Sequence, residues 1–200
     1  WELYADSIFL SLWLAIACLI STLIIGLPAA YGLARHPGWL SRILEEFISL
    51  PLAVPGLALA LALLQLYGSM KGFRVSWTFI LVGHVLYTLP FMVRSILAVL
   101  ASMDLKTLEE GAASLGASPW QRFRDIVVPN AMPGILAGAL TVVTLSIGEF
   151  NLTWMLHTPY LKTLPVGLAD SYASMRLEVA SAYTLVFFVL IVPLLMAMQW

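Results

Sequence analysis

Long apolar runs separated by short polar segments dominate this sequence and limit what it can fold into. The chain has 200 residues, of which 61% are hydrophobic and only 10% are charged, and its mean hydropathy is +0.94. Soluble domains carry about half apolar and about a quarter charged residues. Because a membrane-spanning helix needs about 20 mostly apolar residues, this chain is predicted to be an integral membrane protein.

Five runs are long enough to cross a bilayer, which predicts an all-α, polytopic transmembrane helix bundle. Pro51 and Pro55 lie near the start of the second run, and Pro90 lies inside the third. A proline inside a span removes one backbone hydrogen bond and kinks the helix, and packed neighbours must compensate for it. We therefore expect a bundle with shaped interior space, formed by residues 1–200 as a single transmembrane domain. The predicted spans are residues 7–34, 47–68, 77–103, 132–156 and 180–199.

The segments between the runs differ in kind. Residues 39–48 predict an amphipathic turn at the membrane surface. Residues 157–179 are too polar to span, so we expect a loop and a short helix on the outer surface. Five alternating spans put residues 35–46 and 104–130 on the same side. Basic residues are nearly balanced between the two sides, so the positive-inside pattern supports an orientation only weakly.

The segment 104–130 is polar, charged and helix-prone, and two short helices are expected within it. In the first, Leu108, Ala112 and Leu115 fall at i, i+4 and i+7, on one helical face. In the second, Ser118 is the expected N-cap, followed by proline at the first helical position. This pattern fits an ordinary amphipathic helix at the membrane surface. It equally fits a segment that contacts a partner in water.

Part of this segment resembles the signature loop of permease subunits from ATP-binding-cassette (ABC) importers. In that family the loop reads Glu-Ala-Ala, three residues, Gly, nine residues, Ile-x-Leu-Pro. Here the same spacing is occupied by Glu110-Gly111-Ala112, Gly116 and Ile126-Val127-Val128-Pro129. Gly111 replaces the first Ala and Val128 replaces Leu. The similarity covers nearly the whole chain, including the strings GLPAAY, LGASPWQRFRDIVVP and the His-x5-Pro-Phe pattern that starts at His84.

The resemblance implies the core of a type I ABC importer permease in the bacterial inner membrane, with segment 104–130 as a cytoplasmic coupling loop. Family chains usually carry one more N-terminal span. In the family, this loop sits in a groove of the ATPase subunit and moves with it. The residues expected to dock the ATPase are Glu109, Glu110, Gly111, Ala112, Ala113, Leu115, Gly116, Ala117, Ile126 and Pro129.

The expected partners are an ABC ATPase subunit, a second permease subunit, which makes a homodimer or a heterodimer, an extracytoplasmic solute-binding protein and the lipid bilayer. The chain has no GxxxxGK[ST] phosphate loop. ATP and Mg are therefore expected on the partner ATPase, and this chain is not expected to be an enzyme or to hold a cofactor. It also lacks HExxH and clustered Cys or His residues, so no metal site is expected. A net charge of −1 gives no case for nucleic acid.

Glu149 is the most unusual residue of the predicted spans, because a charge at membrane depth is costly and normally faces protein or water. It either lies on the translocation path or is a structural carboxylate satisfied by donors at a kink. His84 is a second candidate for the path, although a histidine in such a position is more often packed and hydrogen-bonded than a ligand of the substrate. Trp154 is a third candidate, at the outer end of the path.

The transported substrate is a separate question. The string SIGEFNLTWMLHTPYLKTLPVGLADSY resembles permeases for polyamines, aminoethylphosphonate, iron(III) and thiamine, and the Gly-Glu-Phe within it also resembles oxyanion permeases. We expect a polyamine-type substrate first. Two rivals remain. An ion-driven secondary transporter would show internal repeats. A membrane-embedded enzyme would need a nucleophile beside His84, with Ser11, Ser21 or Ser146 as candidates.

Overall fold

In the computed structural model, which describes the backbone of residues 2–199 and the side chains of residues 5–199, the chain forms a bundle of helices. These residues contain no β-strand, and an isolated bridge joins Thr158 to Leu161. Four helical stretches in the described part are long and apolar enough to cross a membrane, and a bent pair of helices makes up to five. The predicted all-α bundle of about five spans is confirmed. The passes are α1 (Glu2–Arg35), the pair α2 (Trp39–Ala53) and α3 (Gly56–Tyr67), α5 (Trp77–Ala101), α8 (Val128–Gly148) and α11 (Leu177–Ala197).

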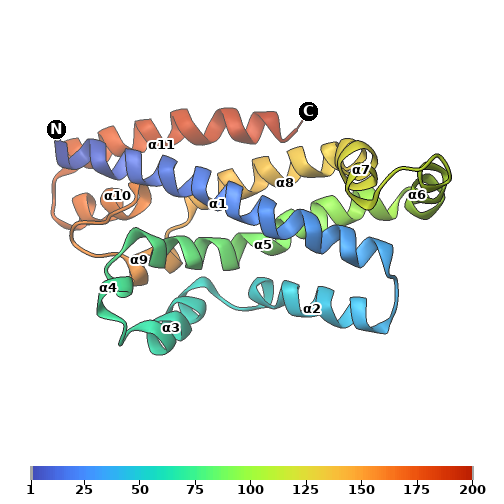
Figure 1. Cartoon of the computed structure of the whole chain (residues 1–200). Helices are drawn as coiled ribbons and strands as arrows, with labels where there is room; N and C mark the ends of the chain where they lie inside the picture. The colour runs from blue at the N-terminus through green and yellow to red at the C-terminus, as the bar shows by residue number, and fades with distance from the viewer. Residues whose placement is uncertain (1, 200) are drawn as a thin grey trace.

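The passes alternate in direction, so the short helices gather at two opposite ends of the bundle (Figure 1). One end carries α6 (Leu105–Ser114), α7 (Pro119–Arg122) and the π-helical turn η1 (Phe123–Val127). The other end carries α4 (Lys71–Arg74), α9 (Asn151–Leu156) and α10 (Leu164–Ala173). The segments 35–46 and 104–130 share one end, as the alternation of spans predicted.

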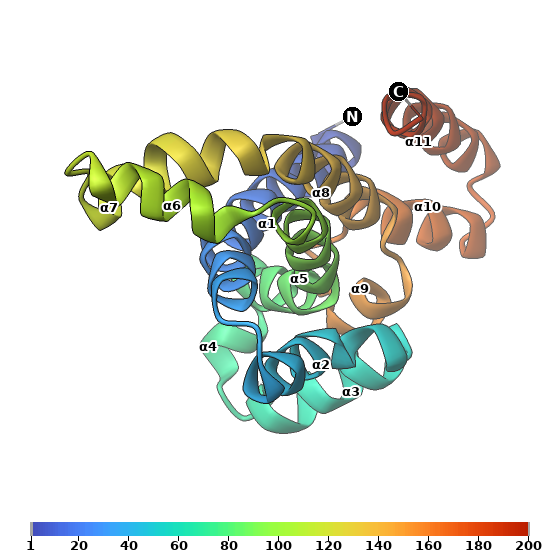
Figure 2. The ribbon, with the colours of Figure 1, turned by 90° about the vertical axis from the view of Figure 1, so that its right-hand side faces the viewer.

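Helices α1, α5 and α8 lie side by side at the centre, with α2 and α3 on one side and α11 on the other (Figure 2). Glycines bring the three central helices together: a Cβ on Gly26 would lie 2.9 Å from Met92, and one on Gly138 would lie 2.8 Å from the Met92 sulfur. At Gly134 a Cβ would lie 2.5 Å from the Ser95 carbonyl oxygen. Close approach at small residues is how helices associate in a membrane, where lipid is as apolar as leucine.

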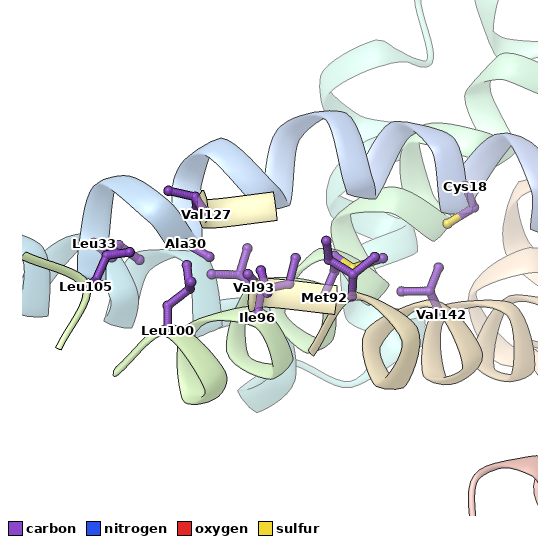
Figure 3. Packing of buried hydrophobic residues seen from close by; sticks show 12 residues of the cluster. Cys18, Ala30, Leu33, Met92, Val93, Ile96, Leu100, Leu105, Val127 and Val142 are labelled. Atoms are coloured by element: carbon purple, nitrogen blue, oxygen red, sulfur yellow. The ribbon is translucent and has the colours of Figure 1, made fainter. Parts of the chain in front are cut away.

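The buried side chains of these helices form one continuous cluster along the half of the bundle that carries α6 and α7 (Figure 3). Ala30 and Leu33 from α1 pack in it with Ile96 and Leu100 from α5. Leu105 of α6 and Val127 of η1 belong to the same cluster, together with Cys18, Met92, Val93, Ala131, Ile135 and Val142. The polar end segment therefore shares a core with the central helices.

The second pass differs from its prediction. Residues 39–48 are not a separate turn, because α2 runs from Trp39 to Ala53 as one helix and Pro51 lies inside it. The break comes at Val54, which is extended (φ −99°, ψ 125°), and α3 then leaves at an angle of 104°. A proline disfavours helical backbone at the preceding residue, so Pro55 sets this break. The predicted single span 47–68 is therefore wrong.

The fourth pass is also not the predicted span 132–156. Its helical run begins at Pro119 and ends at Gly148, and α9 is a separate short helix after the extended residue Glu149 (ψ 119°). Before Pro129 the helix widens into η1, where the Val128 amide bonds to the Phe123 carbonyl five residues back. Proline has no amide hydrogen and clashes with the carbonyl four residues before it, so a wider turn here lets the helix continue.

The predicted short helix between the last two spans is present as α10, but it is packed rather than lying free on the surface. Leu164, Val166 and Gly167 are buried, and the Leu164 amide donates to the Ser11 hydroxyl on α1 at 2.7 Å.

Lys162 donates to Asp170 at 2.8 Å, and this bond holds the pKa of the Asp170 carboxyl below its ordinary value.

The central glycine contact can be tested with Gly134→Ala. The added methyl would meet the backbone of α5, which cannot rotate away, so we expect a loss of stability of about 1–3 kcal/mol. Gly148→Ala on the same helix is the control, since nothing lies within 4 Å of a Cβ there. Unfolding in mixed micelles with increasing denaturing detergent would measure both. Equal midpoints for the two variants would contradict the close contact.

Candidate functional site: an exposed end loop and a buried polar network

Side-chain caps define the start of α6. The Asp104 carboxylate accepts a bond from the Thr107 backbone N–H at 3.2 Å and from the Thr107 hydroxyl at 2.6 Å. These bonds hold the pKa of the Asp104 carboxyl below its ordinary value. The cap thus stays ionised at the helix N-terminus, where negative charge is favoured.

Gly116 ends α6 in a left-handed conformation, with φ +84°. Its amide donates to the Ala113 carbonyl at 2.9 Å, and the Ala117 amide donates to the Ala112 carbonyl at 3.1 Å. This pair of bonds is the Schellman motif, in which a glycine normally occupies the left-handed position. The glycine of the family pattern therefore has a backbone role here, because no Cβ is tolerated cheaply at this φ.

The second short helix starts as predicted. The Ser118 hydroxyl accepts from the Gln121 amide, and the Gln121 side chain accepts from the Ser118 amide at 2.7 Å, which completes a capping box. Pro119 occupies the first turn. The predicted N-cap is confirmed, and local sequence alone accounts for both ends of the turn between α6 and α7.

An open hollow of about 340 Å³ lies on the surface of the loop, between α6 and the helix that follows. Leu115 lines it and is 90% exposed. The predicted docking residues Ala112, Leu115, Gly116, Ala117 and Ile126 all line this hollow. Glu110, Gly111 and Ala113 are exposed on α6, and Pro129 is exposed at the start of α8.

Glu109 is placed differently from the other predicted docking residues. Its side chain is only 4% exposed and points toward α1. The Tyr31 hydroxyl donates to its carboxylate at 2.6 Å, and Arg35 Nη1 donates to the same oxygen at 3.0 Å. Glu109 thus connects the loop to the last turns of α1.

Tyr31 and Arg35 were not among the site residues predicted from the sequence. A signal was present, because residues four apart on a helix lie on one face and a tyrosine and an arginine stand together at the end of an apolar run. Their partner lies 74 to 78 positions further along the chain. Spacing on one helix cannot reveal such a partner.

Glu149 is buried and fully engaged at the start of α9. One carboxylate oxygen accepts from the Leu152 amide at 3.0 Å, and the other accepts from the amide and the hydroxyl of Thr153 at 2.9 and 3.0 Å. The first amides of a helix have no hydrogen-bond acceptor within the helix. The Glu149 carboxylate is the acceptor for two of these amides in α9. Its position therefore matches the structural alternative stated above, a carboxylate satisfied by donors at a break.

His84 joins the same network from α5. Its Nε2 lies 2.8 Å from the Thr153 hydroxyl oxygen and its Nδ1 lies 2.8 Å from the Ser146 hydroxyl oxygen. The single hydroxyl hydrogen of Thr153 goes to Glu149, so His84 Nε2–H donates to Thr153 and Nδ1 accepts from Ser146. The chain Ser146–His84–Thr153–Glu149 thereby ties α8, α5 and α9 together.

A membrane-embedded enzyme would need a nucleophile within hydrogen-bond distance of a base. Ser146 and His84 meet this distance requirement. Both side chains are buried, however, and both His84 nitrogens are held by hydroxyl groups. A substrate would have to displace this packing to reach the serine. Among the described residues, no three His, Cys, Asp or Glu side chains are grouped as a metal site.

Trp154 lies one turn into α9 and is 37% exposed. Its ring packs at 5.3 Å from both Phe150 and His157, measured between ring centroids. It is the most exposed of the three candidates for the translocation path. Arg74 holds the other end of α9, since its Nη1 donates to the Leu156 carbonyl at 2.9 Å.

Comparison with known proteins identifies the same family that the loop residues resemble. The family model described as the binding-protein-dependent transport system inner membrane component matches residues 22–200. The match starts inside α1 and covers the end loop and the polar network.

Individual relatives are named for different transported substrates. The chain is 26% identical over 196 residues to a 2-aminoethylphosphonate transport system permease protein of Salmonella typhimurium, covering 97% of this chain and 73% of the relative. It is 32% identical over 139 residues to a sulfate transport system permease protein of Chlorella vulgaris, covering 64% and 52%. It is 32% identical over 165 residues to a spermidine/putrescine transport system permease protein of Salmonella typhimurium, covering 74% and 57%. The chain thus spans little more than half the length of two of these relatives.

The fold matches a solved structure of the MetNI methionine ABC transporter in an inward-facing conformation, with a TM-score of 0.79, 17% identity and coverage of 99% of this chain and 94% of the other. At this identity the similarity shows the fold alone. The helices that cross the membrane and the matched family agree on a multi-pass protein of the inner membrane. The chain therefore belongs to the family of inner membrane components of binding-protein-dependent transport systems.

Proposed function

We propose that this chain forms the solute path of an ATP-driven importer and that segment 104–130 docks a separate cytoplasmic ATPase. The observation that carries the proposal is the exposed hollow of about 340 Å³ that Leu115 and Gly116 line at the end of the bundle. A soluble partner can bury Leu115 there, and burying an exposed leucine favours association. The small residues Gly111, Ala112 and Ala113 let a partner approach the helix closely.

Energy comes from that partner, which binds ATP and Mg²⁺. We expect two permease subunits and two ATPase subunits in the working importer, with a solute-binding protein on the outer side. Closure of the ATPase pair on ATP would move segment 104–130 and turn the bundle from inward-open to outward-open. The bundle is then a two-state element that partner contacts bias.

A polyamine-type substrate remains the first candidate. A spermidine/putrescine permease protein is 32% identical over 165 residues, which supports it. Relatives named for sulfate and for 2-aminoethylphosphonate match at a similar level, so an oxyanion or a phosphonate is the alternative. Uptake of labelled spermidine, sulfate and 2-aminoethylphosphonate into vesicles containing the complete importer would distinguish them.

For Glu149 and His84 we propose a structural role, in which they hold α9 against α5 and α8. The support is that each polar atom of both side chains has a partner within hydrogen-bond distance. A residue that binds a passing solute needs donors or acceptors that are free at that moment. Trp154, which is partly exposed, is the better candidate for a path residue at the outer end.

The docking role is tested with a pair of glycine variants. Gly116→Ala adds a methyl at φ +84°, where a side chain costs about 1–2 kcal/mol, so we expect ATPase binding to weaken about tenfold. Gly72→Ala adds the same methyl on α4 at the opposite end of the bundle, also with nothing within 4 Å, and should retain the ATPase. Co-purification of the full-length permease with its ATPase in nanodiscs measures both.

Gly116→Asp is a stronger version of this test, because it adds a charge in the hollow as well as backbone strain, and we expect loss of the ATPase with membrane insertion intact. Retention of the ATPase by Gly116→Asp at the wild-type level would show that the loop is not the docking site.

The polar network is tested with Thr153→Val, which removes the hydroxyl between His84 and Glu149. It leaves His84 Nε2–H without its acceptor and Glu149 without one donor, so we expect a loss of about 1–3 kcal/mol in stability. Thr141→Val is the control, since the Thr141 hydroxyl bonds to the Ala137 carbonyl of its own helix. Detergent unfolding curves measure the difference. Equal stability of the two variants would argue against a structural network.

A further inference from the structure

We propose that Tyr31 and Arg35, at the end of α1, carry the movement of segment 104–130 into α1. This inference rests on the proposed docking of an ATPase at that segment. It goes beyond docking because it assigns the connection between the docked loop and the membrane helices to two residues outside the loop. Both act as positioning residues, since neither lies on the exposed hollow.

The first part of the connection is a closed triangle of hydrogen bonds. Tyr31 donates to Glu109, and Arg35 donates both to Glu109 and to the Tyr31 hydroxyl oxygen. The Glu109 side chain is 4% exposed, so its charge is nearly removed from water. Bonds between a guanidinium and a buried carboxylate are among the stronger hydrogen bonds in proteins. Separating α6 from α1 would break the bonds to Tyr31 and to Arg35 together, and both of these bonds are strengthened by the charge on the carboxylate.

The second part is an aromatic contact with the other half of the loop. The Tyr31 ring lies 5.4 Å from the Phe123 ring in an edge-on arrangement, and Phe123 stacks on Trp120 at 5.7 Å. The Arg35 guanidinium lies 5.8 Å from the centre of the Tyr31 ring. Tyr31 therefore touches α6 through its hydroxyl and the α7–η1 helix through its ring. One residue of α1 contacts both halves of the docking segment.

The apolar core extends the same connection. Leu33 of α1 and Leu105 of α6 are buried in one cluster with Val127 of η1 (Figure 3). By contrast, Lys106 and Glu110 form an exposed ion pair inside α6, which connects α6 only to itself. The contacts that leave the segment toward α1 thus include a buried carboxylate and a buried apolar cluster, whereas this ion pair within the segment lies in water. Buried contacts transmit displacement because packed interiors yield little.

The experiment uses the complete importer in nanodiscs, with spin labels on Ile24→Cys of α1 and Lys106→Cys of α6, both at exposed positions. Labelled permease is diluted with unlabelled permease so that distances within one chain dominate, and Cys18 is buried. Distances are measured without nucleotide and with ATP plus vanadate. Wild type is expected to keep one α1–α6 distance in both states, because the two helices move together.

The test variant is Tyr31→Phe with Glu109→Gln, which removes the hydroxyl and the charge while keeping the Tyr31 ring on Phe123. We expect it to retain the ATPase and to show a change in the α1–α6 distance of at least about 2 Å on adding ATP plus vanadate, the size of typical helix shifts. The control is Tyr67→Phe with Glu46→Gln, the same two chemical changes at exposed positions on α3 and α2. It should behave as wild type. If the double variant does not assemble, Arg35→Lys takes its place, because it keeps the charge but loses the planar guanidinium. Its α1–α6 distance should change on adding ATP plus vanadate by more than in wild type and by less than about 2 Å.

Three results would overturn the inference. The first is an unchanged distance in the test variant while the ATPase stays bound. The second is a wild-type distance that changes as much as the variant's. The third is loss of the ATPase from the test variant as complete as from Gly116→Asp, which would make the cluster a part of the docking surface. Failure of wild type itself to hold the ATPase would instead overturn the docking proposal and this inference with it.

Discussion

Close contact between backbones holds the centre of this protein together. Met92 on α5 sits between Gly26 of α1 and Gly138 of α8, and Gly134 faces the backbone of α5 at Ser95. In a bilayer the apolar faces of helices gain little by leaving lipid for protein, so van der Waals packing must supply much of the association. The end segments are continuous with these central helices, because α6 follows α5, η1 leads into α8 and α9 follows α8.

The two breaks in the membrane passes show how a helix can end inside a bundle. Backbone groups exposed by a break must find partners within the protein, since hydrocarbon offers none. For α9 two charged side chains supply them: Glu149 accepts from the first amides, and Arg74 donates to the last carbonyl. Both side chains therefore bond to the ends of α9, and the burial of Glu149 matches this structural use better than direct contact with solute does.

Local and long-range contacts both stabilise the end loop. Its backbone conformation comes from local bonds, namely the Asp104 cap, the Gly116 turn and the Ser118 capping box. Its orientation comes from distant residues, because Glu109 and Phe123 pack against Tyr31 on α1. Local caps make the surface that a partner would meet, while the buried contacts decide how that surface is held relative to the membrane helices.

The all-α membrane class, three of the five passes to within a few residues, and the Ser118 cap of the loop could be predicted from the amino-acid sequence. Each of these depends on neighbours within a few positions, such as the apolar runs or Ser118 before Pro119. The remaining features depend on contacts between helices. Pro51 continues a helix whereas Pro55 breaks one, and Glu149 ends a span that composition alone extends to residue 156. The burial of Glu109 and the partners of His84 depend on residues about 60 to 80 positions away. Hydrogen bonds across such separations form only once the helices have packed, so no local pattern could reveal them.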